Sequence, residues 1–305
     1  MSKKIVVTGA TGLIGKKICE LLINRGDEII VFSRSPQKAK SIIQGAKEYV
    51  KWDLNNPEEW KHKLNGIDSV IHLAGESVMG GRWTDKYKKR ILESRTLTTQ
   101  KLIEALSNAE QKPESFICAS AVGYYAYSET EEFTEDSKPG KHFLAEVTKK
   151  WEEETEKIDA LGVRRCNIRT GIVLDKNEGA LAKMLLPFKL FIGGPLGSGK
   201  QWFPWIHIND TTGIYLYAID NKNVTGALNA VAPEFINMKT FCKNLGNVIM
   251  RPSFFPVPSF VLKLILGKGA EAVIKGAKIK PQKTLGFGYK FQFEKSINAL
   301  SGILQ

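Results

Sequence analysis

The sequence predicts an α/β fold built on a doubly wound parallel sheet, followed by a smaller C-terminal region. Short apolar runs rich in β-branched residues alternate with helical segments through the first 174 residues. A glycine-rich turn separates the first run from the first helix, and Gly and Pro become frequent after Val173. Continuous apolar strands alternating with helices indicate a parallel sheet covered on both faces, which is the Rossmann-type arrangement.

The elements are expected in a regular order. Residues 3–10 form the first strand, and apolar residues at helical spacing place a helix before Gly26. Residues 27–34, 48–54 and 66–75 give the next three strands, with a short helix after the second. A long helix is predicted from about Asp85 to Leu106. Residues 114–125 and 163–174 make the fifth and sixth strands, with a helix over 142–162 between them. Residues 207–221 read as a further helix, capped by Asn209 or Asp210.

Bulk properties favour a reduced, cytoplasmic protein. No run of about 18 apolar residues exists and the N-terminus lacks signal-peptide features, so neither a membrane span nor secretion is expected. The four cysteines form no C-x-x-C pair, and we expect no metal site. Residues 236–305 carry ten Lys and one Arg against Glu271 and Glu294, a balance of +9 within the total of +12. Without a nucleic-acid motif this basic region predicts a solvated surface, and no nucleic-acid partner is expected.

The stretch "TGATGLIG" predicts a dinucleotide site. Gly9 permits a tight turn, Gly12 lets the backbone approach a pyrophosphate, and Gly15 allows close packing of the following helix on the sheet. Thr11, Leu13 and Ile14 complete the loop and the first helical turn. Phosphates are expected on the N-terminus of that helix, where free N–H groups favour anions.

The end of the second strand selects between dinucleotides. Ser33 and Arg34 stand where an acidic residue would bind the ribose hydroxyls of NAD. A hydroxyl and a guanidinium suit a 2′-phosphate, so NADP(H) is preferred over NAD(H). Asp53, in "KWDL", is expected to face the adenine. The alternative is that Arg34 is only a surface charge.

Several segments together resemble one family. They are "TGATGLIG", "LAGESV", "ILESRTLTTQKL", "SAVGYY", "WEEE", "GGPLGSGKQWFPWIHINDTTG", "NAVAPE" and "RPSFFPVP". With these the chain resembles the NAD-dependent epimerase/dehydratase-like family of the extended and atypical short-chain dehydrogenase/reductase superfamily, a group also labelled cell-division inhibitor homologues. The resemblance implies that Leu73, Ala74 and Gly75 pass the adenosine ribose and pyrophosphate. It also implies that Arg90 or Arg95 flanks the cofactor and that backbone at Val173 lines the nicotinamide.

The catalytic motif of that superfamily is incomplete here. Short-chain dehydrogenases use Ser with a Y-x-x-x-K pair on the helix after strand five, and Ser120 supplies the serine. Aligning the helix through Trp151 places Leu144 and Thr148 at the Tyr and Lys positions. Tyr124, Tyr125 and His207 are candidate substitutes. Each has a structural alternative: packing with a hydrogen-bonded tip for the tyrosines, and a hydrogen-bonding role for the histidine.

The segment "GGPLGSGKQWFPWIH" imitates a phosphate-binding P-loop but lacks its context. Gln201 follows Lys200 where Ser or Thr would hold Mg²⁺, and Pro204 blocks a following helix. An NTPase is therefore excluded. We expect the segment to form a cleft wall, with Trp205 and His207 facing the nicotinamide.

Two functions remain open from the sequence. One is an NADP(H)-dependent oxidoreductase or epimerase-like enzyme that acts on a small polar, sugar-like molecule with a non-standard acid. The other is a catalytically silent NADPH-binding regulatory or interaction protein. The predicted organisation is an NADP-binding domain over residues 1–174, with 206–232 packing back on it, and a substrate-facing domain over 175–305. The apolar, Lys-containing run 254–280 has the composition of an interfacial helix, but we expect it to pack on its own domain, without membrane association.

Overall fold

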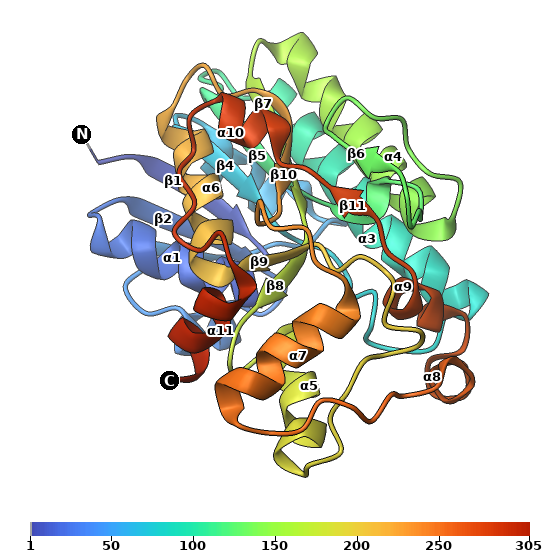
Figure 1. Cartoon of the computed structure of the whole chain (residues 1–305). Helices are drawn as coiled ribbons and strands as arrows, with labels where there is room; N and C mark the ends of the chain where they lie inside the picture. Colours follow the sequence, from blue (N-terminus) through green and yellow to red (C-terminus); the bar gives the residue numbers. More distant parts are fainter. Residues whose placement is uncertain (1) are drawn as a thin grey trace.

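The computed structural model describes residues 2–305, and a parallel sheet forms their centre (Figure 1). The strands across this sheet follow the order β10-β7-β5-β4-β1-β2-β3. They are β1 (Lys4–Thr8), β2 (Glu28–Ser33), β3 (Glu48–Lys51), β4 (Ser69–His72), β5 (Ser115–Ala121), β7 (Arg164–Thr170) and β10 (Gly226–Ala230). The order reverses at β1, with β2 on one side and β4 on the other, so ligands are expected at the carboxyl ends of these strands. The predicted fold class is confirmed.

Helices cover both faces of the sheet. On one face lie α1 (Leu13–Asn24), α2 (Pro36–Ile42) and α6 (Ile208–Asp220), and on the other lie α3 (Asp85–Ser107) and α4 (Phe143–Glu156) (Figure 1). The alternation of side chains along β1 explains this two-sided core. Ile5 and Val7 pack on the face of α1, whereas Val6 packs on the face of α3.

The predicted sixth strand is divided in the structure. It consists of β7 and, after Gly171, β8 (Ile172–Leu174), which leaves the large sheet and pairs in parallel with β9 (Trp205–His207). A glycine is needed at the division, because a Cβ at Gly171 would lie 2.3 Å from the carbonyl oxygen of Pro204, which accepts the N–H of Ile172 at 2.8 Å. A second parallel pair joins β6 (Glu132–Phe133) to β11 (Lys278–Ile279).

The C-terminal helices build a core of their own, which includes Leu185, Trp205 and Phe241. Three helices contribute to this core: α5 (Gly179–Lys189), α7 (Met238–Ile249) and α11 (Ser296–Leu304). The other C-terminal helices are α8 (Ser259–Leu266), α9 (Glu271–Ile274) and α10 (Gln282–Gly286). Figure 1 shows α5 and α7 beyond β8 and β9, with α8 and α9 beside them. The same chain returns to the large sheet through α6 and β10. The division at residue 174 stays a prediction.

Short 3₁₀ helices occupy several connections. They cover residues 57–59, 61–64, 122–124, 157–161 and 267–270. Of these, the turn at 122–124 follows the end of β5 directly and carries the chain toward the tyrosines. None of the helices formed by residues 2–305 has the length and hydropathy that crossing a bilayer requires.

Candidate cofactor and substrate site

The glycine loop lies between β1 and α1, in the geometry that the sequence predicts. Gly9 has a φ of +67°, and a Cβ there would lie 2.7 Å from the backbone of Leu73. A Cβ at Gly15 would lie 2.4 Å from the carbonyl oxygen of Gly9. Gly12 is the N-cap of α1 with no side chain to cap it. The first-turn N–H groups at Leu13 and Ile14 therefore have no intrahelical acceptor and suit an anion such as a pyrophosphate.

Thr8 and His72 fix the end of β4 beside this loop. The Thr8 Oγ1 accepts the N–H groups of Leu73 (3.2 Å) and Ala74 (3.3 Å) and lies 2.7 Å from the Nδ1 of His72. The other ring nitrogen of His72 lies 3.1 Å from the Oγ1 of Thr99, which donates to the Arg95 carbonyl. The hydroxyl of Thr99 therefore accepts from His72 Nε2–H, and Thr8 donates to Nδ1. Burial lowers the pKa of His72 to about 3, so the ring is neutral.

The residues predicted to select the dinucleotide lie at the ends of β2 and β3. The Ser33 hydroxyl accepts the N–H of Ser35 at 3.1 Å, and Arg34 is exposed beside it. The Asp53 carboxylate accepts the backbone N–H of Asn55 at 3.0 Å and the side-chain amide of Asn56 at 3.1 Å. These bonds lower its pKa and hold its oxygens in a local turn. An adenine-facing role for Asp53 stays a prediction.

Arg95 and Arg90 take different positions on α3. The Arg95 guanidinium lies 5.1 Å from the ring centroid of Trp151 and donates to the Ile91 carbonyl at 2.8 Å. A Cβ at Gly75 would lie 3.2 Å from its Cζ, so Arg95 adjoins the end of β4. Burial lowers its pKa to about 10, against the opposing charge of Glu76, and it stays cationic at neutral pH. Arg90 is 60% exposed and pairs with Glu76 at 2.9 Å, so Arg95 is the better cofactor candidate.

A cavity of about 600 Å³ begins where the glycine loop ends. Gly179, at the start of α5, lines it, and a Cβ at Gly179 would lie 3.5 Å from Leu13 Cδ2 and 3.6 Å from the carbonyl oxygen of Val173. The turn after β5 lines the cavity through Val122 and Gly123. The predicted cofactor loop and this cavity are therefore neighbours, which is the arrangement that a cofactor and its substrate need.

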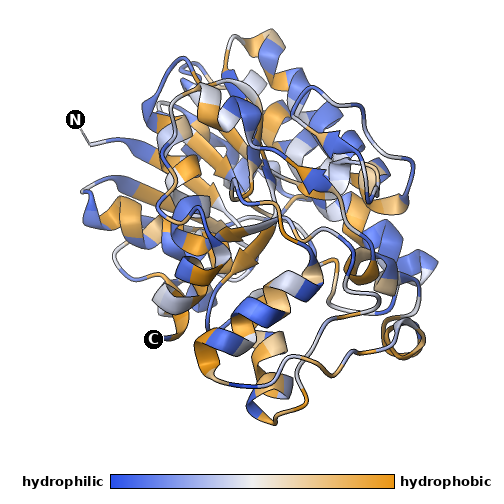
Figure 2. Ribbon diagram, viewed as in Figure 1, coloured by the Kyte–Doolittle hydropathy of each residue, from blue (hydrophilic) through white to orange (hydrophobic). Residues whose placement is uncertain are grey.

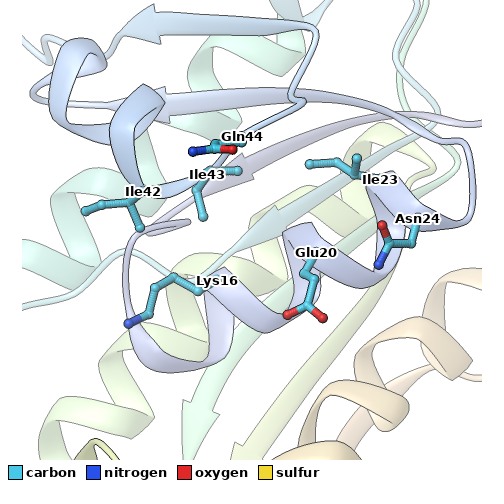
Figure 3. Close-up of a pocket in the computed structure, with 7 residues that line it drawn as sticks. All are labelled: Lys16, Glu20, Ile23, Asn24, Ile42, Ile43 and Gln44. Carbon is cyan, nitrogen blue, oxygen red and sulfur yellow. The ribbon is translucent and has the colours of Figure 1, made fainter.

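A second hollow of about 320 Å³ is separate from this site (Figure 3). Figure 3 shows Lys16, Glu20 and Asn24 along α1 facing Ile42, the last residue of α2, and the two residues after it, Ile43 and Gln44. No residue of the glycine loop is among those, all within the described chain, that line it. The Lys16 ammonium pairs with Glu178. The hollow is a groove between two surface helices.

Ser120 is held in a buried ion-pair cluster and does not line the cavity. Its Oγ donates to Glu152 at 2.5 Å, and Glu152 accepts two bonds from Arg169, at 2.9 and 2.7 Å. The side chains of Glu152 and Arg169 are 9% and 5% exposed. Because the hydroxyl proton is committed to a carboxylate, the predicted role of Ser120 in polarising a substrate oxygen has no support in this geometry.

Tyr124 and Tyr125 belong to the same cluster. The Arg169 guanidinium lies 3.5 Å from the ring centroid of Tyr124 and donates to the Tyr125 hydroxyl at 2.9 Å. The Tyr125 hydroxyl donates in turn to Asn229 at 2.6 Å. Burial raises the pKa of both phenols. Tyr125 presents its ring to the cavity while its hydroxyl is engaged elsewhere.

His207 is a helix cap. Its Nδ1 accepts the N–H of Asn209 at 3.0 Å, so the predicted caps Asn209 and Asp210 were wrong. Its ring stacks on Phe293 at 3.9 Å between centroids. Burial lowers its pKa to about 4, opposed by Asp175. The expectation that Trp205 and His207 face the nicotinamide stays a prediction without support in this geometry, because Trp205 is fully buried in the C-terminal core and neither residue lines the cavity.

The two positions of the missing Y-x-x-x-K motif hold no side chain that can donate a proton as Tyr or Lys would. Leu144 lines the cavity against Gly123, and Thr148 donates its hydroxyl to the Leu144 carbonyl at 2.8 Å. Tyr127, which the sequence reasoning missed, also lines the cavity and stacks on His142 at 3.9 Å. Burial, and then the charge of Glu271, raise its pKa, and no hydrogen bond from a described residue contributes. The sequence feature that could have identified Tyr127 is the third tyrosine in "GYYAY".

The former P-loop candidate forms part of the cavity wall. Trp202 and Phe203 line the cavity, and Trp205 begins a strand, so no helix follows Lys200. The cleft-wall prediction is confirmed for Trp202 and Phe203.

The sheet order, the glycine loop and the adjoining cavity define an α/β protein of the dinucleotide-binding Rossmann type. The chain belongs to the NAD dependent epimerase/dehydratase family, whose match covers residues 5–230. Residues 257–303 match a domain of unknown function, DUF1731. This confirms the resemblance drawn from the motifs.

Relatives and solved structures agree with this membership. The chain is 40% identical over 303 residues to the chloroplastic epimerase family protein SDR39U1 homolog of Arabidopsis thaliana, covering 99% of this chain and 86% of the relative. The crystal structure of human epimerase family protein SDR39U1 (isoform 2) with NADPH superposes with a TM-score of 0.87 at 35% identity, over 98% of both chains. UDP-N-acetylglucosamine 4-epimerase from Bacillus cereus superposes at 0.78 with 18% identity, over 99% of this chain and 98% of the epimerase, and shows the fold alone.

Proposed function

We propose that this protein binds NADP(H) and transfers hydride between it and the carbonyl or alcohol carbon of a small molecule. The observation that carries the proposal is that the cavity adjoins the glycine loop, since Gly179, which lines the cavity, lies beside Leu13. The human relative solved with NADPH supports the choice of cofactor. Two successive transfers at opposite faces of one carbon would give the epimerisation that the family name describes.

The chain's own residues hold the cofactor in this proposal. Gly9, Gly12 and Gly15 admit the pyrophosphate to the N-terminus of α1. Arg34, exposed beside the end of β2, pairs with the 2′-phosphate. Backbone at Val173 runs beside the nicotinamide, which supplies the hydride when bound.

Tyr127 is the proton donor that we propose. When hydride reaches a carbonyl carbon, the oxygen becomes an alkoxide and takes one proton, so the site needs a donor at the cavity. The Tyr127 phenol lines the cavity, and its raised pKa keeps it protonated at neutral pH. An alkoxide is a stronger base than a phenolate, so the transfer is downhill. Lys275 lies 5.4 Å from the Tyr127 ring centroid and pairs with Glu271 at 2.8 Å.

A specific observation favours the alternative of a silent regulatory protein. Leu144 and Thr148 occupy the acid–base positions, and Ser120 is tied to Glu152. A chain with the same cofactor loop and no proton donor would bind NADPH without turnover. Tyr127 is the residue that separates the two functions.

Cofactor fluorescence tests the proposal. Titration with NADPH and NADH is expected to show tighter binding of NADPH, with the preference lost in Arg34→Ala. NADPH oxidation is then measured with a panel of ketones and aldehydes, and Tyr127→Phe should lower kcat while leaving the Kd for NADPH unchanged. Binding of NADPH with no oxidation of any carbonyl would favour the regulatory protein, and binding of neither cofactor would refute the proposal.

A further inference from the structure

We infer that the cavity takes a small apolar carbonyl compound, an alkyl or aryl ketone or aldehyde, in place of the polar, sugar-like molecule expected from the sequence. The inference rests on the proposed function, because the carbonyl is the group that the hydride would reach. The apolar body is inferred independently, from the chemistry of the cavity wall.

Aliphatic and aromatic side chains from distant parts of the chain form this wall. They include Val122, Ile172, Met184, Leu196, Phe203 and Ile279. Pockets of a few hundred Å³ with such walls gain affinity by removing apolar ligand surface from water. A sugar would bring several hydroxyl groups, each of which loses its water and needs a new partner.

Several polar groups around the cavity are already engaged by the protein, but the Gln201 Oε1 is buried and has no hydrogen-bond partner among the described residues. The Trp202 Nε1 donates to the Glu129 carbonyl at 2.8 Å, and the Gln201 Nε2 donates to the Leu196 carbonyl at 2.8 Å. The Tyr125 hydroxyl is bound to Asn229 and Arg169. These bonds leave the Tyr127 phenol as a donor for a carbonyl oxygen and the Gln201 Oε1 as an acceptor, which are few partners for the many hydroxyl groups of a sugar.

The charges near the cavity do not suit a diphosphate. Lys183 and Lys275 are the charged residues among those that line it. Lys275 pairs with Glu271 at 2.8 Å, and Lys183 is exposed on α5. Diphosphates are usually held by bidentate Arg side chains or by helix N-termini. No Arg side chain lines this cavity within the described residues. Of the longer helices, α5 begins at the cavity with Gly179, which adjoins the cofactor loop, and α7 begins there with Met238, where the Asn237 side chain already caps the helix.

The apolar surface continues from the cavity to the outside through α8. Leu262 and Leu266 line the cavity, whereas Phe260 and Leu264 are 71% and 73% exposed on the same helix. Figure 2 shows α8 coloured as apolar. A helix that is apolar on both faces offers an apolar ligand a continuous path, whereas a polar ligand would have to leave water at this surface.

Binding to protein saturated with NADP⁺ tests the substrate class without requiring turnover. The probes are 2-hexanone, 2-octanone and 2-decanone, with UDP-N-acetylglucosamine as the nucleotide sugar, each titrated by calorimetry. Affinity should rise about fourfold for each added methylene that the cavity buries, from the transfer free energy of about 0.8 kcal/mol per methylene. The series uses wild-type protein, so it stands even where a variant fails to fold.

A matched pair of variants locates the binding site. Met184→Asp places a charge in the cavity wall and is expected to weaken 2-decanone binding at least tenfold, whereas Met184→Leu keeps it. Leu186→Asp makes the same change two residues along α5, where the side chain is 63% exposed and does not line the cavity, and should leave binding unchanged.

The outcomes separate this inference from the proposed function. Affinity independent of chain length, or tighter binding of the nucleotide sugar than of 2-decanone, would overturn the inference. Equal losses in the two Asp variants would also overturn it. Length-dependent binding of the ketones with no oxidation of NADPH would support the apolar cavity and count against hydride transfer. The ketone titration is repeated without cofactor, so that a failure to bind NADP⁺ leaves the cavity still tested.

Discussion

The cluster of Ser120, Glu152 and Arg169 allows a structural role for the serine to be separated from a catalytic one. Ser120→Ala removes a hydrogen bond to a carboxylate, and Glu152→Ala leaves the Arg169 guanidinium without its two charge-assisted bonds. In the Glu152→Ala variant burial disfavours the charged guanidinium without Glu152 to oppose it. Arg169 then remains as a buried charge without its partner, because a guanidinium does not lose its proton at neutral pH.

The sizes of the two losses follow from the burial of the pair. With 9% and 5% of the side chains exposed, breaking the pair from one side should cost about 3–5 kcal/mol of unfolding free energy. A hydrogen bond to a charged group contributes about 1.5–3 kcal/mol, which sets the expected cost of Ser120→Ala. Because Ser120 and Arg169 share one carboxylate, the two losses should be smaller together than their sum.

Urea denaturation measures these values, and cofactor titration runs in parallel. Ser120→Ala should lower the unfolding free energy while leaving the Kd for NADPH unchanged. Glu153→Gln, on the exposed face of α4 beside Glu152, is the control and should change little. Full stability of Ser120→Ala together with loss of turnover would refute the structural role and return Ser120 to the catalytic site.

Three further predictions concern the loop and the histidines. Gly15→Ala puts a Cβ 2.4 Å from the Gly9 carbonyl oxygen and should weaken NADPH binding more than tenfold, as measured by cofactor fluorescence. The pKa of about 3 for folded His72 lies below its ordinary 6.5, so the unfolded chain binds the proton first. The contribution of His72 to the unfolding free energy is therefore complete above pH 6.5 and is lost as the pH falls toward 3, by up to about 1.4 kcal/mol per pH unit. The variant His72→Gln should show a smaller loss over this pH range when the unfolding free energy is measured by urea denaturation. His207→Ala removes the cap of α6 and should lower the unfolding free energy by about 1 kcal/mol without changing the Kd for NADPH.

Local pattern was enough to predict most of the large sheet. The strands of the first domain are short apolar runs between polar turns, and the helix predicted from Asp85 to Leu106 is observed as Asp85–Ser107. The break at Gly171 could not be predicted, because after it the chain pairs with β9, which lies more than 30 residues away in the sequence. The cap of α6 was missed because a histidine ring nitrogen took a role that Asn and Asp usually perform.

The site residues also divide into those that local sequence pattern predicts and those that depend on tertiary packing. Gly9, Gly12 and Gly15 act through local backbone geometry, so the sequence could place them. The roles of Trp205 and Tyr127 depend on which side of the chain faces the C-terminal helices, which the pattern "WFPWIH" does not encode. The cytoplasmic location and the domain boundary also stay predictions.

Leu144 connects the missing motif with the nature of the cavity. A tyrosine at this position would place a hydroxyl at the cavity wall, and the observed leucine places apolar surface there, against Gly123. The substitution therefore removes the usual acid and lowers the polarity of the wall at the same point. A polar substrate would lose a partner by this change, whereas an apolar ketone gains contact and needs only one donor at its oxygen. The departure from the Y-x-x-x-K motif is thus consistent with a change of substrate as well as with a loss of chemistry. The double variant Leu144→Tyr with Tyr127→Phe separates a change of substrate from a loss of chemistry. If the cofactor is held ready for hydride transfer, the new tyrosine should restore turnover and weaken the binding of 2-decanone.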